Sequence, residues 1–258
     1  MSDPPILPIK SLSSRLGILS RADGSCQWTQ GCGCVLAAIY GPTYVKASSS
    51  SNFSDTVFLD VRPIYEINDN QILNSNLNGR QNLTELKYYL LSIFKPLIFD
   101  PLYPRCKISA IIQIIEYDSN ILSCCINAMA MALIDAGVSI SHLVSAVTLS
   151  TTHRPDPSEP FSITLDPTQE QLQLSLCSLV TAWNHTGTSS FELLLNHCPP
   201  NDPDLSVTAY RATLAASKLA ASKILHFQRL SLTQKTLYQL QPKPQDQKKH
   251  KPQSKNKK

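Results

Sequence analysis

The chain has 258 residues, of which 42% are hydrophobic and only 16% charged, and its formal net charge is +4. This balance excludes a chain that is disordered throughout, because disordered proteins combine few apolar residues with many charged ones. No apolar run approaches the ~18 residues of a membrane span. We also expect no secretory signal, because the N-terminus lacks a basic start leading into an apolar stretch.

The net charge is distributed unevenly along the chain. Residues 241–258 hold seven lysines and one aspartate, a net charge of +6, whereas residues 1–240 hold 16 basic and 18 acidic side chains, a net charge of −2. The basic character therefore belongs to the tail. We predict a flexible N-terminus at 1–14, one folded domain at 15–235 and a disordered lysine-rich tail at 236–258.

Eight cysteines are spread along the chain. An even number could indicate disulfides in a secreted protein, but the length permits a real core and no secretory signal is expected. Cys32 and Cys34 could begin a zinc site, yet no matching C-x₂-C or H-x₃-H pair exists. We therefore predict buried thiols in a reducing compartment.

The first part of the chain favours strands. Asp23-Gly24 is a turn signal of the hairpin kind. Cys32–Tyr40 is an apolar, strand-like run that is predicted to stop at Gly41-Pro42. Thr56–Ile64 alternates like a further strand, and the polar, asparagine-rich residues 66–80 predict a surface loop.

The middle of the chain contains the clearest helical signals. Leu83–Phe94 repeats apolar residues at helical spacing, and Ile108–Ile115 is a candidate buried strand. Residues 118–120 form a turn and a possible N-cap. Ile121–Ala136 then predicts a helix with one apolar face, and Gly137 stands where a helix-ending glycine belongs.

The last part of the chain predicts more strands and a final helix. Leu143–Ser150 and Phe161–Leu165 are strand-like, and alternation favours a strand over Leu172–Trp183. Ser206–Leu230 predicts an alanine-rich helix whose inward side chains are Val207, Tyr210, Leu214, Ala221 and Leu225. This order of elements predicts an α+β domain and not a regular βαβ repeat.

The familiar chemical motifs are absent from the sequence. It contains no GxGxxG, P-loop, HExxH or GxSxG motif, and its six histidines are scattered. Nothing supports a cysteine–histidine nucleophile pair, although spacing alone does not exclude one. Motifs therefore predict only an α+β domain with a basic tail.

Three segments, taken together, nevertheless resemble the ribonuclease PH-like family. Ser20–Ser25 reads Ser-Arg-Ala-Asp-Gly-Ser and precedes an apolar strand that ends Tyr-Gly-Pro; Tyr103–Val138 and Leu165–Thr168 agree in order and spacing. The resemblance covers about residues 15–232. Within the family, Ser20–Ser25 and Cys124–Ala128 (Cys-Cys-Ile-Asn-Ala) most resemble a non-catalytic ring subunit of the eukaryotic RNA exosome.

This resemblance implies a ribonuclease PH-like domain made of two β/α halves, with mixed sheets packed against helices. It implies a ring built with other ribonuclease PH-like subunits, RNA-binding cap subunits and RNA as partners, and no membrane, cofactor or metal. The implied role is structural support of 3′-to-5′ RNA processing and degradation, including rRNA processing and mRNA decay. The implied locations are the nucleus, with its nucleolus, and the cytoplasm.

The resemblance also implies which catalytic residues are missing. Active relatives read Asp-Gly-Gly-Thr-Arg before the central helix, where the arginine holds phosphate; here Leu122 fills that position. Two aspartates follow a Leu-Asp strand in active relatives, and here Leu172 or a neighbour fills those positions. Asp166 and Glu170 are the acids that remain, with Glu170 a weak catalytic candidate. We predict no catalytic residue, and keep an active phosphorolytic 3′–5′ exoribonuclease as the alternative.

The candidate RNA-binding residues are all basic. Arg80 and Arg105 stand where the resemblance implies arginines that hold RNA, although the positions next to Arg80 read Asn82 and Glu85. Either arginine could equally be structural. The tail adds Lys248, Lys249 and Lys251, whose cluster suits RNA contact, nuclear import or mere solvation.

Overall fold

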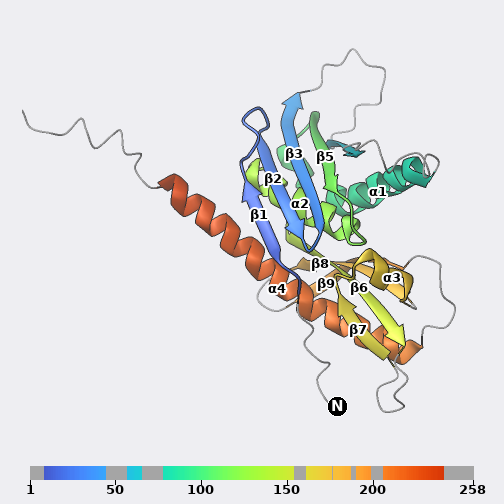
Figure 1. Ribbon diagram of the computed structural model, residues 1–258. Helices are drawn as coiled ribbons and strands as arrows, with labels where there is room; N and C mark the ends of the chain where they lie inside the picture. The colour runs from blue at the N-terminus through green and yellow to red at the C-terminus, as the bar shows by residue number, and fades with distance from the viewer. Residues whose placement is uncertain are drawn as a thin grey trace, which may run out of the picture.

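The computed structural model describes residues 9–44, 57–65, 78–153, 161–175, 177–186, 190–198 and 206–240, with backbone alone at Tyr65, 78–82 and His153. Two sheets form the body of the molecule (Figure 1). The first has the order β1-β2-β3-β5-β4, and its strands are Leu12–Leu16, Gly24–Gln30, Gly33–Tyr44, Cys106–Glu116 and Phe58–Tyr65 respectively. The second has the order β7-β6-β8-β9, with strands Phe161–Leu165, Leu143–His153, Cys177–His185 and Phe191–His197.

The helices connect and cover these sheets. α1 (Asn78–Phe94) belongs to the part of the chain that connects the parallel neighbours β4 and β5. Two short 3₁₀ turns follow α1 in the chain, η1 at Lys95–Leu97 and η2 at Asp100–Leu102. The remaining helices are α2, α3 and α4, which span Ile121–Asp135, Gln169–Gln173 and Val207–Leu240. The predicted α+β class is confirmed. No helix among the described residues is long and apolar enough to cross a membrane.

The first sheet shows two departures from the predicted turns. β3 does not stop at Gly41-Pro42 but continues to Tyr44, with a register shift between Tyr40 and Thr43. Gly41 makes the irregularity possible: it adopts φ 111°, which favours glycine, and its N–H donates to Asp23 Oδ2 at 2.7 Å. Asp23 therefore braces this irregularity and does not form a tight hairpin turn, since the β1–β2 connection spans residues 17–23.

α2 is the centre of the core. Twelve of its fifteen residues are buried, and it packs on β2 and β3 of the first sheet and on β6 and β8 of the second. The expectation of a single apolar face is therefore wrong, because the second sheet covers the side that would otherwise meet solvent. The helix ends as predicted, with Gly137 at φ 70°. Gly24 permits its close approach, since a Cβ there would lie 2.2 Å from the Ala136 nitrogen.

α4 covers the second sheet and continues past it. It packs on β6, β8 and β1, and in Figure 1 its C-terminal end extends away from both sheets. Ala221 and Leu225 are buried as predicted, whereas Val207 is 73% exposed. Val207 is the first residue of α4, and the prediction that its side chain faces inward is wrong.

Several predicted bounds also change. Leu172–Trp183 is not one strand: Thr168 caps α3 through a capping box with Gln171, and β8 begins only at Cys177. The predictions did not include β9. β1 begins at Leu12 and α4 ends at Leu240, so the structured region extends beyond the expected domain bounds of 15 and 235 at both ends. Of the expected 66–80 loop, residues 78–80 are helical and the part from 66 to 77 lies outside the described residues.

Candidate functional site

The turn before α2 is the first candidate site. It joins β5 to α2, and Asn120 occupies the N-cap position without making a capping hydrogen bond through its side chain. The Asn120 Nδ2 instead donates to the Gln30 carbonyl at 2.8 Å. The Ser119 hydroxyl donates to the Pro167 carbonyl, which ties this turn to the segment that follows β7.

Asp166 lies in that segment and is fully buried. Its backbone adopts φ 48°, and its Oδ1 accepts a hydrogen bond from Gln30 Nε2 at 2.7 Å. Burial raises the pKa of Asp166 to about 6, and the nearby Asp118 carboxylate acts in the same direction. The hydrogen bond from Gln30 and the charge of Lys10 lower the pKa but only partly offset the burial.

A buried polar network connects this turn to both sheets. Gln30 Oε1 accepts from Trp28 Nε1 and from Asn127 Nδ2, each at 3.2 Å. Asn127 also exchanges hydrogen bonds with the backbone of Ala146 on β6, both at 2.9 Å. The asparagine of the Cys-Cys-Ile-Asn-Ala segment thus satisfies backbone groups between the sheets, which is a structural role.

Four buried polar atoms near the β2–β3 hairpin have no hydrogen-bond partner among the residues that the structure describes. They are Lys10 Nζ, Asp118 Oδ2, Asn120 Oδ1 and Asp166 Oδ2. The hairpin glycines leave room for two of these side chains: a Cβ at Gly31 would meet Lys10, and one at Gly33 would meet Asn120. Two carboxylates and one ammonium group therefore gather around the N-terminal turn of α2.

The electrostatics of this turn disfavour a bound phosphate. A helix N-terminus normally favours an anion, but here two carboxylates of the chain itself occupy the surroundings of that turn. Leu122 follows in the first turn of α2, half-buried and packed against the core. Glu170 is exposed in the first turn of α3, where Leu172 is half-buried. Within the described residues, no group of three or more His, Cys, Asp or Glu side chains could hold a metal ion.

Of the predicted RNA-binding residues, only Arg105 has a described side chain, and it lies away from this turn. Arg105 is exposed at φ 57° and immediately precedes β5. The eleven residues of β5 separate it from the turn before α2, which corresponds to roughly 30–35 Å. Arg80 lies in α1, but its side chain is outside the described residues, as are Lys248, Lys249 and Lys251.

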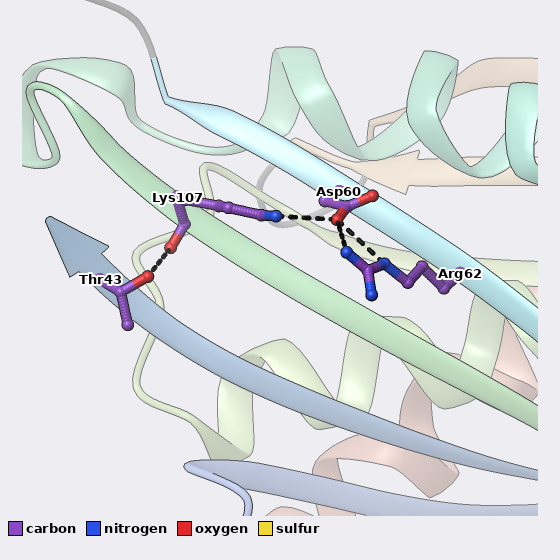
Figure 2. Close-up of polar contacts among 4 residues, drawn as sticks. All are labelled: Thr43, Asp60, Arg62 and Lys107. Carbon is purple, nitrogen blue, oxygen red and sulfur yellow. Dashed lines mark hydrogen bonds and ion pairs between the residues drawn. The ribbon is translucent and has the colours of Figure 1, made fainter. Parts of the chain in front are cut away.

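A second candidate site lies on β4 and β5, around Asp60 (Figure 2). Asp60 Oδ2 accepts from Lys107 Nζ at 2.9 Å and from Arg62 Nη2 at 2.8 Å. The Lys107 hydrogen bond, followed by that of Arg62, holds the pKa of Asp60 below its ordinary value despite its partial burial. Thr43 Oγ1 donates to the Lys107 carbonyl at 3.2 Å and connects β3 to the cluster.

An exposed aromatic ring lies beside this cationic cluster. The Lys107 ammonium lies 5.6 Å from the Phe58 ring centroid, and Phe58 is 60% exposed. Arg105 is a further exposed cation two residues before Lys107 in the chain. We call Phe58, Arg62, Arg105 and Lys107 the cationic–aromatic corner. Such a surface suits a phosphate backbone with unstacked bases. Sequence reasoning missed it because only strand register brings Arg62 and Lys107 together.

Comparisons with known proteins give the family. Residues 8–139 match the model of the 3′ exoribonuclease family, domain 1. The chain belongs to this family. It is 34% identical over 135 residues to the Schizosaccharomyces pombe exosome complex component rrp46, covering 52% of this chain and 55% of that protein. It is 30% identical over 148 residues to the putative exosome complex component RRP41 of Caenorhabditis briggsae, covering 54% and 58% respectively. Each match thus spans little more than half of the relative's length.

A solved structure supports the same fold for more of the chain. The crystal structure of rice (Oryza sativa) Rrp46 superposes with a TM-score of 0.67 at 23% identity, covering 87% of this chain and 96% of that one. The family match ends at residue 139, so the likeness in fold is what extends the assignment over the second sheet and α4. The ribonuclease PH-like resemblance and fold are both confirmed.

Proposed function

We propose that this family member is a non-catalytic structural subunit of an exosome ring. In that role it supports 3′-to-5′ RNA processing and degradation by building the ring and lining its RNA channel. Other ribonuclease PH-like subunits, RNA-binding cap subunits and RNA are its partners, in the nucleus, the nucleolus and the cytoplasm. Support comes from relatives that are named as exosome complex components.

The observation that carries the non-catalytic role is the α2 N-terminal turn. A phosphate nucleophile would meet Asp118, Asp166 and the apolar Leu122 in place of an arginine. Losing one positioned contact to a developing charge costs about 3–4 kcal/mol of transition-state stabilisation. The like charges of the carboxylates add repulsion to that loss, because the phosphate is itself an anion.

The first test is therefore a phosphorolysis assay. Purified protein, incubated with a short RNA and inorganic phosphate, should release no nucleoside diphosphates above the level without protein. A phosphorolytic ribonuclease of the same family serves as the positive control. Phosphate-dependent release that Asp166→Ala or Glu170→Ala abolishes would instead establish the alternative, an active phosphorolytic 3′–5′ exoribonuclease. Co-purification with ring and cap subunits tests the structural role separately.

RNA contact by the tail predicts a strong dependence on salt. Each lysine that meets a phosphate releases a counterion, so affinity falls steeply as salt increases. If residues 241–258, with their +6 charge, contact RNA, deleting them should flatten the slope measured from ~50 to ~200 mM salt while ring assembly persists. If the full-length and truncated proteins have equal RNA affinities and equal salt slopes, the tail does not contact RNA, and its role is nuclear import or solubility.

We expect the cationic–aromatic corner to make a smaller and separate contribution to the salt dependence of RNA binding. Arg105→Ala should reduce the single-strand salt slope by about 0.7, the contribution of one phosphate contact. Arg15→Ala is the matched control, because Arg15 lies on β1 at the opposite edge of the same sheet. Identical slopes for the two variants would assign Arg105 a structural role at its φ 57° turn.

A further inference from the structure

Two cysteines that are distant in sequence meet at one end of the second sheet. Cys177 begins β8 and is buried, whereas Cys198 directly follows β9 and is exposed. Their Sγ atoms are 2.9 Å apart. That separation is less than 1 Å longer than the ~2.05 Å of a disulfide bond. The two thiols are therefore already close to bonding distance.

The position of the pair in the β8–β9 hairpin gives a bond there a mechanical effect. β8 and β9 are antiparallel, and Val180 lies opposite His197. At the other end Thr186 N–H donates to the Ser190 carbonyl at 3.1 Å, so the cysteines stand at the open end of the hairpin. Among the described residues, β9 is also an edge strand, paired with β8 on one side. A covalent bond would close the hairpin at both ends and hold the edge strand in place.

Accessibility separates this pair from the core cysteines. Burial raises the pKa of Cys26 to about 12 and also raises the pKa of Cys124 and Cys125, which disfavours their reactive thiolate forms. Cys198 is exposed and can meet an oxidant from solution. Cys177 lies behind it as the resolving thiol, in contact with the sulfur that would be oxidised first.

We propose that Cys177 and Cys198 form a reversible redox modification site whose oxidant is a peroxide. The Cys198 thiolate attacks the O–O bond of hydrogen peroxide, forming a sulfenic acid and releasing hydroxide, which is protonated to water. The Cys177 thiolate then attacks the sulfenic sulfur and expels a second hydroxide, forming the disulfide. Two thiols are oxidised, one peroxide is reduced to two waters, and a dithiol reductant reverses the bond. In a reducing compartment such a bond is transient.

Peptide mapping of the full-length folded protein tests this site. After stoichiometric hydrogen peroxide, non-reducing digestion and mass spectrometry should find one cross-linked peptide pair containing Cys177 and Cys198, which dithiothreitol separates. Cys198→Ser and Cys177→Ser should each abolish the pair. Cys32→Ser should retain it, because Cys32 is an exposed cysteine at the β2–β3 turn and not part of the pair. Cross-links to other cysteines alone, or Cys198 over-oxidised without a cross-link, would overturn the proposal.

Hydrogen exchange then measures the mechanical effect independently of any RNA assay. A disulfide between Cys177 and Cys198 would restrict local opening of the β8–β9 hairpin. Amide exchange in β9 should therefore slow by roughly tenfold or more in the oxidised protein. Exchange in β5, in the other sheet, serves as the internal reference. Unchanged exchange in β9 would show that the bond does not fix the edge strand. The exposed position of Cys198 makes Cys198→Ser the variant of choice if Cys177→Ser does not fold.

Discussion

Leu133→Ala should destabilise the protein by about 2–5 kcal/mol, because truncating a fully buried leucine leaves a cavity as well as losing apolar burial. Leu133 is 0% exposed, as is Met129 one turn earlier on α2. The helix is enclosed by two sheets, so its surroundings have little freedom to collapse into the space. The loss corresponds to about 2–4 °C in melting temperature per kcal/mol for a chain of this size.

Urea unfolding of Leu133→Ala, followed by circular dichroism, measures this cost. Leu219→Ala is the matched control, because Leu219 is also helical but 53% exposed on α4, and surface changes usually stay within ~0.5 kcal/mol. The yield of assembled ring should fall with Leu133→Ala and not with the control. Equal unfolding midpoints for the two variants would contradict the enclosed position of α2.

Asp166→Asn should stabilise the protein at neutral pH by up to about 3 kcal/mol. The pKa of this buried carboxyl is raised from 3.8 to about 6, and each pKa unit corresponds to ~1.4 kcal/mol. Asparagine keeps an oxygen that accepts from Gln30 Nε2 and tolerates the φ of 48°. Its new N–H₂ group also enters a region where Asp118 Oδ2 and Asn120 Oδ1 lack partners.

The pH profile of stability gives the sign of this effect. Because the folded-state pKa is raised, protonated Asp166 favours folding below pH 3.8, and this advantage is lost as the pH rises through about 6. The gain from Asp166→Asn should therefore be near zero at pH 3.8 and reach its full value above about pH 6. Urea unfolding of both proteins at several pH values measures it.

Asp60→Asn is a control variant that should change the stability at neutral pH in the opposite direction. The Lys107 and Arg62 hydrogen bonds lower the folded-state pKa of Asp60, so the ionised group contributes stability above its unfolded pKa and loses it in acid. Asp60→Asn should therefore destabilise the protein at neutral pH. A stability gain from Asp166→Asn that does not change with pH would show that ionisation of the carboxyl is not its cause.

Sequence reasoning succeeded where the signal is local. The helical spacing of Ile121–Ala136 and the glycine at 137 predicted α2 and its end, and Phe161–Leu165 matches β7. It failed where two local signals compete. The alternation of apolar residues over Leu172–Trp183 favoured a strand, whereas the capping box at Thr168 begins the helix α3. The expectation that Leu122 replaces a phosphate-binding arginine came from the family resemblance and not from periodicity, and it stays a prediction.

The sequence by itself thus determined the class and most elements, because side-chain periodicity and short motifs act over a few residues. Only the tertiary structure decided what surrounds Leu122. Gln30, Asp118 and Asp166 are far apart in the chain, and they meet because α2 packs between two sheets whose pairing no local pattern specifies. The same holds for Lys107 beside Asp60, and for Cys177 and Cys198, whose Sγ atoms the pairing of β8 with β9 brings to 2.9 Å.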